Sequence, residues 1–325
     1  MALRGGIDLG GTKIQTVVVD TTGEVRGQAR HPTPQQGGPP AVAEAMAGAL
    51  REAAEQAGVP TADLLGVGIG SPGSIDATSG TVTSARNLSE WEGSFALAPA
   101  LAEQLGCPTA LGNDVSVATL GEFHLGAGRP YRTLLGVFWG TGVGGGIILD
   151  GEPWHGVGAA GEIGHVVVKQ GGRTCTCGRI GCLEAYAGRG AMELRARREH
   201  FEEGRKTKLF ELMEDKGADR LKSSVWAKAL EHGDDLAVDL IDHAVEALAV
   251  GIASAVNLLD VPAVIFGGGL GTRFGEPMAD RVRAAMLPHL FNDHRPPAFH
   301  VAALGDLGGA VGASLLVGEP SAPSL

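Results

Sequence analysis

Short runs of β-branched and other apolar residues alternate along the chain with longer stretches of helical periodicity. Four of the apolar runs end in bunched glycines, at residues 6–13, 67–73, 138–146 and 264–271. A stretch such as AVAEAMAGALREAAEQAG, residues 41–58, has the pattern of a helix. Strands that alternate with helices predict an α/β protein in which tight glycine turns follow the strands.

The most apolar long stretch covers residues 235–260 and contains Asp239, Asp242, His243 and Glu246. These ionisable side chains argue against a membrane span. The stretch is apolar on too many sides for the surface of a monomer. We therefore expect a helix that is buried either in the core of its domain or in a dimer interface.

Two segments of the chain repeat one pattern. GIDLGGTKIQTVVVD, residues 6–20, and GVFWGTGVGGGIILD, residues 136–150, align with a constant offset of 130, so that Gly10 pairs with Gly140. Both predict a strand, a tight glycine turn and a second strand. The repeat indicates a duplicated domain, which agrees with a length of 325 residues, more than one core usually reaches. The alternative is chance similarity between two glycine-rich hairpins.

The net charge of −11 narrows the range of partners. Nucleic acids and anionic membranes bind basic surfaces, so an acidic chain is not expected to have either as its main partner. The N-terminus enters a strand-like run without the apolar region of a secretory signal. We therefore expect a cytoplasmic protein with no nucleic-acid and no membrane partner.

Neither glycine hairpin is a Walker A loop, because the GxxxxGK[ST] spacing is absent. Glycine turns still let backbone N–H groups surround an anion, and two such turns, one from each domain, would suit a polyphosphate. The acid in the first hairpin could hold a magnesium ion through water. The residues expected to bind the nucleotide and its magnesium here are Asp8, Gly10, Gly11, Thr12, Lys13, Gly140, Thr141 and Gly142.

A third glycine bunch, Gly267, Gly268 and Gly269, follows the apolar VPAVIF and precedes a helical pattern. Ligands bind at such strand-loop-helix corners in α/β folds, so we expect part of the nucleotide site there. The alternative is a plain tight turn.

Three of the four cysteines, Cys175, Cys177 and Cys182, fall within eight residues, and His165 lies ten residues before the first of them. In a chain expected in the cytoplasm, clustered cysteines indicate metal or redox chemistry rather than disulfides.

The motifs DLGGTK, GTGVGGGI and GHVVV…CTCGRIGCLE resemble the two phosphate loops and the zinc signature of the ROK family of bacterial sugar kinases and repressors. The resemblance covers essentially the whole chain. It implies an α/β, two-lobed actin-like fold (ribonuclease H-like and duplicated) and ATP-dependent phosphorylation of a hexose. We place the small lobe at residues 1–112, completed by a C-terminal helix at 305–318, and the large lobe with the zinc loop at 113–304.

The zinc signature supplies a Cys₃His set for a closed, tetrahedral structural site, formed by His165, Cys175, Cys177 and Cys182. The alternative is three buried or redox-active cysteines. A histidine that binds metal through one ring nitrogen keeps its other N–H for a sugar hydroxyl. The resemblance further implies that Glu162, His165 and Glu184 together bind sugar hydroxyls. Without the resemblance, either glutamate would be a solvated surface acid.

Asn113 and Asp114 end an apolar run and precede a helical stretch. They resemble the catalytic pair of the family, in which Asp114 would be the general base that takes the proton of the sugar's primary hydroxyl. The alternative is that one of the two caps the helix, and both roles can hold. The same resemblance implies that Gly73 and Asn87 also bind the sugar.

We therefore expect an ATP:hexose phosphotransferase acting on a primary hydroxyl, with glucose as the first candidate. ATP, Mg²⁺ and structural Zn²⁺ are the expected cofactors, and a homodimer or homotetramer is the expected assembly. Alternatives are a kinase for fructose, mannose, allose or N-acetylmannosamine, polyphosphate as the donor, and a non-catalytic sugar-sensing protein. A repressor is disfavoured, because the phosphate loop starts near the N-terminus and leaves no room for a DNA-binding module before it.

Overall fold

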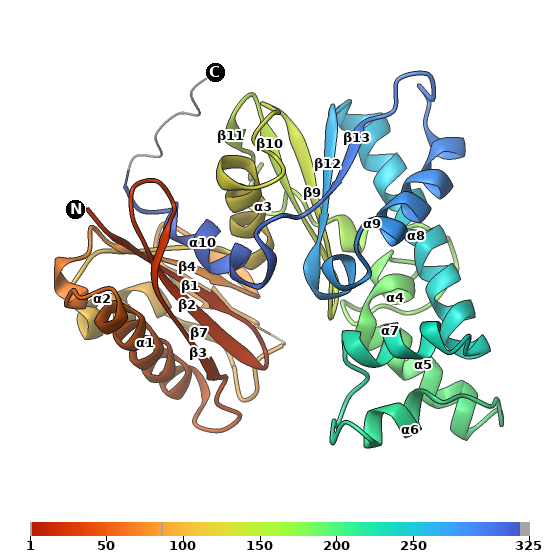
Figure 1. Ribbon diagram of the computed structural model, residues 1–325, viewed down its shortest axis with the longest axis horizontal. Helices are drawn as coiled ribbons and strands as arrows, with labels where there is room; N and C mark the ends of the chain where they lie inside the picture. Colours follow the sequence, from red (N-terminus) through yellow and green to blue (C-terminus); the bar gives the residue numbers. More distant parts are fainter. Residues whose placement is uncertain (1, 86, 319–325) are drawn as a thin grey trace. The chain divides into compact units, whose positions relative to one another are not determined.

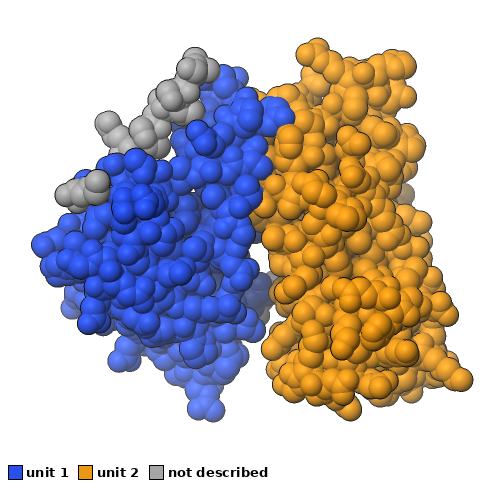
Figure 2. Space-filling view, in the orientation of Figure 1, with its two compact units in different colours: residues 1–132, 146–160, 303–325 blue, residues 133–145, 161–302 orange. Residues whose placement is uncertain are grey.

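The computed structural model describes residues 2–85 and 87–318, which form an α/β fold. Packing divides the chain into two compact units, coloured separately in Figure 2. Unit 1 comprises residues 1–132, 146–160 and 303–325, and unit 2 comprises residues 133–145 and 161–302.

Unit 1 is built on a five-stranded sheet of β1 (Arg4–Leu9), β2 (Lys13–Val19), β3 (Val25–Pro32), β4 (Val67–Ser71) and β8 (Thr109–Asn113). Its strand order is β3-β2-β1-β4-β8 (Figure 1). β2 pairs antiparallel with β1 and β3, whereas β4 is parallel to both β1 and β8. The sheet therefore has a parallel half that begins at β1.

The other elements of unit 1 connect and cover this sheet. A small sheet contains β5 (Ser74–Asp76), β6 (Thr81–Thr83) and β7 (Ser94–Phe95). The helices are α1 (Gly38–Gln56), α2 (Leu97–Leu105), α3 (Asp114–Leu125) and α10 (Gly308–Ser314), with the 3-10 turns η1 (Thr61–Asp63) and η4 (Gly305–Leu307). β11 (Glu152–Pro153) pairs with the end of β10 (Val143–Leu149).

Successive residues of β1 face opposite sides of the sheet. A Cβ at Gly5 would lie 3.2 Å from Leu50 of α1, and a Cβ at Gly6 would lie 1.9 Å from the carbonyl oxygen of Ala310 in α10. The two helices therefore cover opposite faces, and α10 packs so close to the sheet that only glycine fits beneath it.

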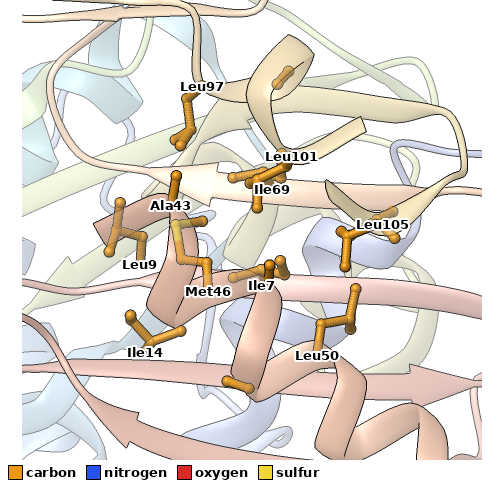
Figure 3. Packing of buried hydrophobic residues seen from close by; sticks show 14 of the residues in the cluster. Ile7, Leu9, Ile14, Ala43, Met46, Leu50, Ile69, Leu97, Leu101 and Leu105 are labelled. Carbon is orange, nitrogen blue, oxygen red and sulfur yellow. The ribbon is translucent and has the colours of Figure 1, made fainter. Parts of the chain in front are cut away.

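The α1 face holds the main core of unit 1. Burial of each large aliphatic side chain here contributes roughly 1.5–3 kcal/mol. Figure 3 shows part of this cluster, including Ile7, Leu9, Ile14, Ala43, Met46, Leu50, Ile69, Leu97, Leu101 and Leu105.

Unit 2 contains the first residues of β10 with β9 (Leu134–Trp139), β12 (Ala263–Gly267) and β13 (Ala298–Val301), in the order β10-β9-β12-β13. β12 pairs parallel with both β9 and β13. The helices are α4 (Glu184–Ala187), α5 (Arg189–Phe201), α6 (Leu209–Glu214), α7 (Ser223–Glu231), α8 (Asp235–Leu259) and α9 (Gly268–Met286), with the 3-10 turns η2 (Ile163–His165) and η3 (Leu287–His289).

The apolar stretch at residues 235–260 forms the helix α8, as predicted. Asp234 caps this helix by accepting a hydrogen bond from the backbone N–H of Ala237 at 2.9 Å. One side of α8 is buried in unit 2, whereas Leu258 near its end is 84% exposed. None of the helices in the described part of the chain is both long and apolar enough to cross a bilayer.

Packing assigns the residues after position 112 differently from the predicted lobes. Residues 113–132, which include α3, lie in unit 1. The reason is the close contact of α3 with α10, where a Cβ at Gly312 would lie only 1.9 Å from the carbonyl oxygen of Val117. The helix expected at 305–318 is shorter, because η4 precedes it and α10 ends at Ser314.

Candidate active site

Three parallel strands of unit 1 bring predicted site residues to one edge of the sheet. In the strand register, Asp8 of β1 lies beside Gly70 of β4, which lies beside Gly112 of β8. Asp114 follows β8 directly, and Gly73 follows β4 with a φ of 100°. Because ligands bind outside the carboxyl ends of strands in α/β sheets, Asp8, Gly73 and Asp114 share an edge suited to a ligand.

The start of α3 separates the roles of Asn113 and Asp114. The side-chain oxygen of Asn113 accepts hydrogen bonds from the N–H groups of Val115 and Ser116, both at 3.1 Å, so Asn113 is the N-cap. Asp114 is the first helical residue, and its Oδ1 accepts from the N–H of Val115 at 2.9 Å. The partial positive charge of the helix N-terminus stabilises an ionised Asp114 carboxylate.

Asp8 lies at the end of β1 in a confined environment. Burial raises the pKa of Asp8 to about 6, which the nearby charge of Lys13 opposes and that of Asp306 reinforces. Lys13 Nζ lies 3.9 Å from an oxygen of Asp306. A Cβ at Gly309 would lie 2.7 Å from the carboxyl carbon of Asp8, so α10 begins against this group. A bound cation would stabilise the ionised form of such a carboxyl group.

The turn between β1 and β2 contains four of the predicted nucleotide-binding residues, Gly10, Gly11, Thr12 and Lys13. The N–H of Gly10 donates to the carbonyl of Lys13 at 2.9 Å, and Thr33 Oγ1 donates to the carbonyl of Gly10 at 2.7 Å. A Cβ at Gly11 would lie 2.5 Å from the carbonyl oxygen of Asn87. The structure therefore places the backbone of Asn87 against the first glycine turn.

The second glycine turn, Gly140 to Gly142, lies between β9 and β10 in unit 2, and the N–H of Gly140 donates to the carbonyl of Gly142 at 2.9 Å. Arg189 Nη2 donates to Thr141 Oγ1 at 2.8 Å. Burial lowers the pKa of Arg189, which stays cationic at neutral pH. A cavity of about 260 Å³ adjoins the turn and is lined by Thr141, Arg189, Gly190, Glu193, Leu194, Arg197 and Arg220. Three guanidinium groups make this cavity suitable for an anion.

The predicted glycine corner lies next to this second turn. Gly267 ends β12 and α9 begins at Gly268, whose φ is 82°. A Cβ at Gly268 would lie 2.6 Å from the backbone nitrogen of Trp139, and a Cβ at Gly140 would lie 3.7 Å from the nitrogen of Gly269. The N-terminus of α9 and the turn therefore present their N–H groups in one region of unit 2, as anion binding requires.

The cysteine cluster forms in a short loop of unit 2. The candidate ligand atoms of His165, Cys175, Cys177 and Cys182 all lie within 4.8 Å of one another. The loop turns at Gly178 and Gly181, whose φ values of 87° and 88° are left-handed. The sulfurs of Cys177 and Cys182 are 3.7 Å apart, close to the roughly 3.8 Å expected for two thiolates with tetrahedral 2.3 Å bonds to zinc.

The ionisation of the thiols also fits a metal site. Burial, followed by the neighbouring Cys177 thiol, raises the pKa of Cys182 to about 12. Burial also opposes ionisation of Cys177, but hydrogen bonds from the Arg179 backbone and the other thiols outweigh it and lower the pKa to about 6. Without a cation the three sulfurs cannot all ionise together, whereas a thiophilic divalent ion would stabilise three thiolates.

The two predicted glutamates lie on either side of this cluster. His165 turns Nδ1 toward the sulfur of Cys175, 3.9 Å away, and its Nε2 lies 3.8 Å from a carboxylate oxygen of Glu162. Glu184 is the first residue of α4, and its Oε2 accepts from the N–H of Val143 at 3.0 Å. Glu184 therefore joins the cysteine loop, residues 175–182, to the start of β10 and is not a solvated surface acid, whereas the side chain of Glu162 is 56% exposed.

Arg189 was not predicted as a site residue. Its signal is weak, since GRG after the zinc signature is one more glycine-flanked arginine in a chain with 52 glycines. Only the fold shows that α5 begins beside Thr141, where the N–H of Arg189 donates to the carbonyl of Gly140 at 3.1 Å.

Known proteins resemble this chain along nearly its whole length. A glucokinase from Halalkalibacterium halodurans is 34% identical over 317 residues, which cover 96% of this chain and 94% of that protein. The structure of a ROK family glucokinase from Streptomyces griseus, in complex with glucose and AMPPNP, matches with a TM-score of 0.81 at 32% identity, covering 97% of this chain and 99% of that one. A ROK hexokinase structure from Thermus thermophilus matches with a TM-score of 0.79 at 33% identity, covering 97% of both chains.

These matches confirm the predicted actin-like α/β fold of the ROK sugar kinases. The sequence profile of the ROK family matches residues 4–319. The chain therefore belongs to the ROK family, as its three motifs predicted.

Proposed function

We propose that this protein transfers the γ-phosphoryl group of ATP to the primary hydroxyl of glucose, giving glucose 6-phosphate and ADP. The predicted class, a hexose kinase, is confirmed by relatives that carry this activity in their names. The observation that carries the proposal is the shared sheet edge of Asp8 and Asp114 in unit 1, which offers one acid for the nucleotide and one for the sugar.

Asp114 acts as the general base. Its carboxylate accepts the proton of the glucose 6-hydroxyl while the oxygen bonds to the γ-phosphorus, and the bond to the bridging oxygen breaks as ADP leaves. Asn113 holds the first turn of α3 in place by its two backbone hydrogen bonds. The cap thereby fixes the direction of the base, on which the rate of such a transfer depends strongly.

The glycine turns bind the nucleotide. Backbone N–H groups at Gly11 to Lys13 and at Thr141 and Gly142 surround phosphate oxygens, in turns that the N–H groups of Gly10 and Gly140 close, and those of Gly268 and Gly269 add the N-terminus of α9. Asp8 would hold through water the magnesium ion that accompanies ATP. Arg189 adds a cationic side chain beside Thr141, which favours binding of the phosphate groups of ATP.

Sugar hydroxyls are bound by Glu162, His165 and Glu184, with Gly73 and Asn87 contributing from unit 1. The cluster of His165, Cys175, Cys177 and Cys182 would hold a structural zinc ion, whose bond to His165 would fix the orientation of the imidazole. Nδ1 of His165 faces the sulfurs, so Nε2–H remains as a donor for a hydroxyl group or for Glu162.

The protein works as a cytoplasmic homodimer or homotetramer in this proposal. Support for association comes from exposed apolar side chains in unit 2. Leu258 is 84% exposed and Phe291 is 95% exposed, and Asn257 ties the two segments together through the N–H of Phe291 and the carbonyl of His289. Light scattering at micromolar concentration tests this part, and a monomer would contradict it.

The test of the function is ADP release from ATP and Mg²⁺ with single sugars. The panel contains glucose, mannose, fructose, allose, N-acetylmannosamine and N-acetylglucosamine, and the protein is first shown to contain its metal. We expect the largest kcat/KM with glucose and a fall of about 10²–10⁴ in kcat for Asp114→Asn. Higher turnover with another sugar would show that this sugar, and not glucose, is the substrate. Turnover only with polyphosphate would show that polyphosphate, and not ATP, is the donor. A lack of turnover with every sugar and both donors would contradict the proposal.

A further inference from the structure

Glu122 in the last turn of α3 is a buried acid without a cationic partner among the described residues. Only 2% of its surface is exposed. Within residues 2–85 and 87–318, no lysine, arginine or histidine forms an ion pair with it. A buried carboxylate is unfavourable unless hydrogen bonds replace its hydration, so its partners explain why an acid occupies this position.

Three backbone N–H groups supply those hydrogen bonds. Oε2 accepts from Ala127 at 2.9 Å and from Ala303 at 3.0 Å, and Oε1 accepts from Leu304 at 2.8 Å. Bonds of this kind to an ionised acceptor are roughly twice as strong as neutral ones. A Cβ at Gly126 would lie 2.0 Å from Oε2, so the absence of a side chain at that residue makes room for the carboxylate.

The three donors belong to two passages of the chain between the units. Ala127 begins the stretch that leaves unit 1 after Arg132, and Ala303 is the first residue after the chain returns from unit 2. The carboxylate of Glu122 therefore binds two segments to α3: the one at Ala127, before the chain first leaves unit 1, and the one at Ala303 and Leu304, where it last returns. These contacts all lie within unit 1.

The segment at residues 303–309 also contacts the hairpin that contains the first glycine turn. Asp306, two residues after Leu304, lies 3.9 Å from Lys13 Nζ, and the start of α10 at Gly309 lies against Asp8. α3 itself begins with Asp114. Glu122 is thus hydrogen-bonded to the segment that contacts Asp8. It also lies on α3, the helix that begins with the proposed base, Asp114.

We propose that Glu122 is a positioning residue for phosphoryl transfer. Its carboxylate holds the segment at 303–309 in register with α3, so that Asp8 and Asp114 keep a fixed separation. This inference rests on the proposed kinase function.

The test compares Glu122→Gln with Glu199→Gln. Glutamine keeps the shape of Glu122 but has one acceptor oxygen, so at least one N–H loses its partner. Glu199 is 7% exposed and pairs with Arg195 and Arg205 in unit 2, so it is a buried acid with a structural role only. Both variants are assayed at a temperature well below their unfolding transitions.

We expect kcat of Glu122→Gln to fall about 10- to 100-fold, with the KM for glucose changed less than about threefold, as a small misplacement of reacting groups produces. Glu199→Gln should keep wild-type kcat even if it unfolds at a lower temperature. Hydrogen exchange should be faster at the amides of Ala303 and Leu304 in Glu122→Gln and unchanged at α8. Wild-type kcat in Glu122→Gln, or equal losses of kcat in both variants, would overturn the proposal.

A milder variant covers the case in which Glu122→Gln does not fold. A Cβ at Gly308 would lie 3.2 Å from Leu304 Cβ and 3.9 Å from Glu122 Oε1, so Gly308→Ala should push Leu304 away from the carboxylate. We expect a smaller fall in kcat, of about threefold to tenfold, with faster exchange at Leu304. If wild type itself shows no kinase activity, the proposed function fails on its own. Unchanged exchange at Ala303 and Leu304 in the variants would then separately overturn the role of Glu122.

Discussion

The two repeated hairpins, β1–β2 in unit 1 and β9–β10 in unit 2, share a backbone plan but obtain their chemistry differently. Each has a glycine turn that a hydrogen bond from the first glycine closes, at Gly10 and at Gly140. In unit 1 the charged groups belong to the hairpin itself, since Asp8 is the last residue but one of β1 and Lys13 begins β2. The hairpin of unit 1 thus contains both its own carboxylate, Asp8, and its own cation, Lys13.

The positions with the same 130-residue offset in unit 2 are Phe138 and Val143, which carry no charge. Here the acid is Glu184, whose carboxylate accepts from the N–H of Val143, and the cation is Arg189, which donates to Thr141. Both come from the segment that follows the cysteine loop, residues 175–182. The comparison teaches that a duplicated turn can keep its backbone role while its side-chain chemistry comes from a later segment of the chain.

Removal of the proposed metal should give the largest effect, and of the two hairpins it should affect only that of unit 2. Cys182→Ser deletes a fully buried ligand, so we expect loss of the metal by mass spectrometry and a fall in kcat/KM of more than about 100-fold. Hydrogen exchange should rise at Val143 and stay unchanged in β2. The control is Cys107→Ser, in the core of unit 1, which should keep its metal. Full activity in metal-free Cys182→Ser would contradict the link between the loop and the hairpin.

Asp8→Asn tests whether unit 1 depends on its own acid. Asparagine keeps the size of the side chain but removes the charge that favours a hydrated magnesium ion. We expect kcat to fall by about 10²–10³, as for other losses of electrostatic stabilisation, with little change in the KM for glucose. Steady-state kinetics over a range of Mg²⁺ concentrations measures this. A glucose KM that rises while kcat stays constant would place Asp8 in the sugar site instead.

Arg189→Lys tests the cation supplied to unit 2. Lysine keeps the charge but cannot reproduce the planar donor geometry toward Thr141. We expect the KM for ATP to rise about tenfold, equivalent to about 1.4 kcal/mol, with the KM for glucose unchanged. Arg197→Lys, on the same cavity but 38% exposed and paired with Glu193, serves as the control and should change the KM for ATP less. Equal effects in the two variants would remove the special role of Arg189.

The ends of the two hairpins allow a smaller test, on stability. Asp20 is buried, and hydrogen bonds from Thr22 and Arg26 hold the pKa of its carboxyl well below its ordinary value. The equivalent Asp150 has a φ of 53°, which asparagine adopts as readily. We expect Asp20→Asn to lower the free energy of unfolding by about 2 kcal/mol at pH 7 and Asp150→Asn to change it by less than about 0.5 kcal/mol.

The pH dependence of this difference has a defined sign. Because the folded pKa of Asp20 is lowered, its carboxylate stabilises the protein fully above the unfolded pKa of about 4, and this stabilisation is lost as the pH falls further. Urea unfolding of wild type and Asp20→Asn should therefore differ at pH 6 and converge toward pH 3. A difference that grows at low pH would contradict the assignment.

The sequence predicted those features that depend on short-range pattern. The repeat offset located both hairpins, the spacing of three cysteines and one histidine located the cluster, and Asn113–Asp114 marked the start of α3. These features depend on turn geometry and ligand spacing, which neighbouring residues determine.

Features that depend on packing across the chain were not predictable in this way. Arg189 and Glu122 act through contacts with Thr141 and with Ala303, which lie far away in sequence. The assignment of α3 to unit 1 depends on its contact with α10, in which Val117 and Gly312 are 195 residues apart in the chain. Nothing in the local pattern of either helix indicates that contact.

The most direct test of the account is the identity of the product. Wild-type protein that contains its metal is incubated with ATP, Mg²⁺ and ¹³C-labelled glucose, and the position of the new phosphoryl group is read by ³¹P and ¹³C NMR. The account predicts glucose 6-phosphate and ADP in equal amounts, and no sugar phosphate on the same timescale with Asp114→Asn. A phosphoryl group at another carbon, or the same product at the same rate with Asp114→Asn, would contradict it.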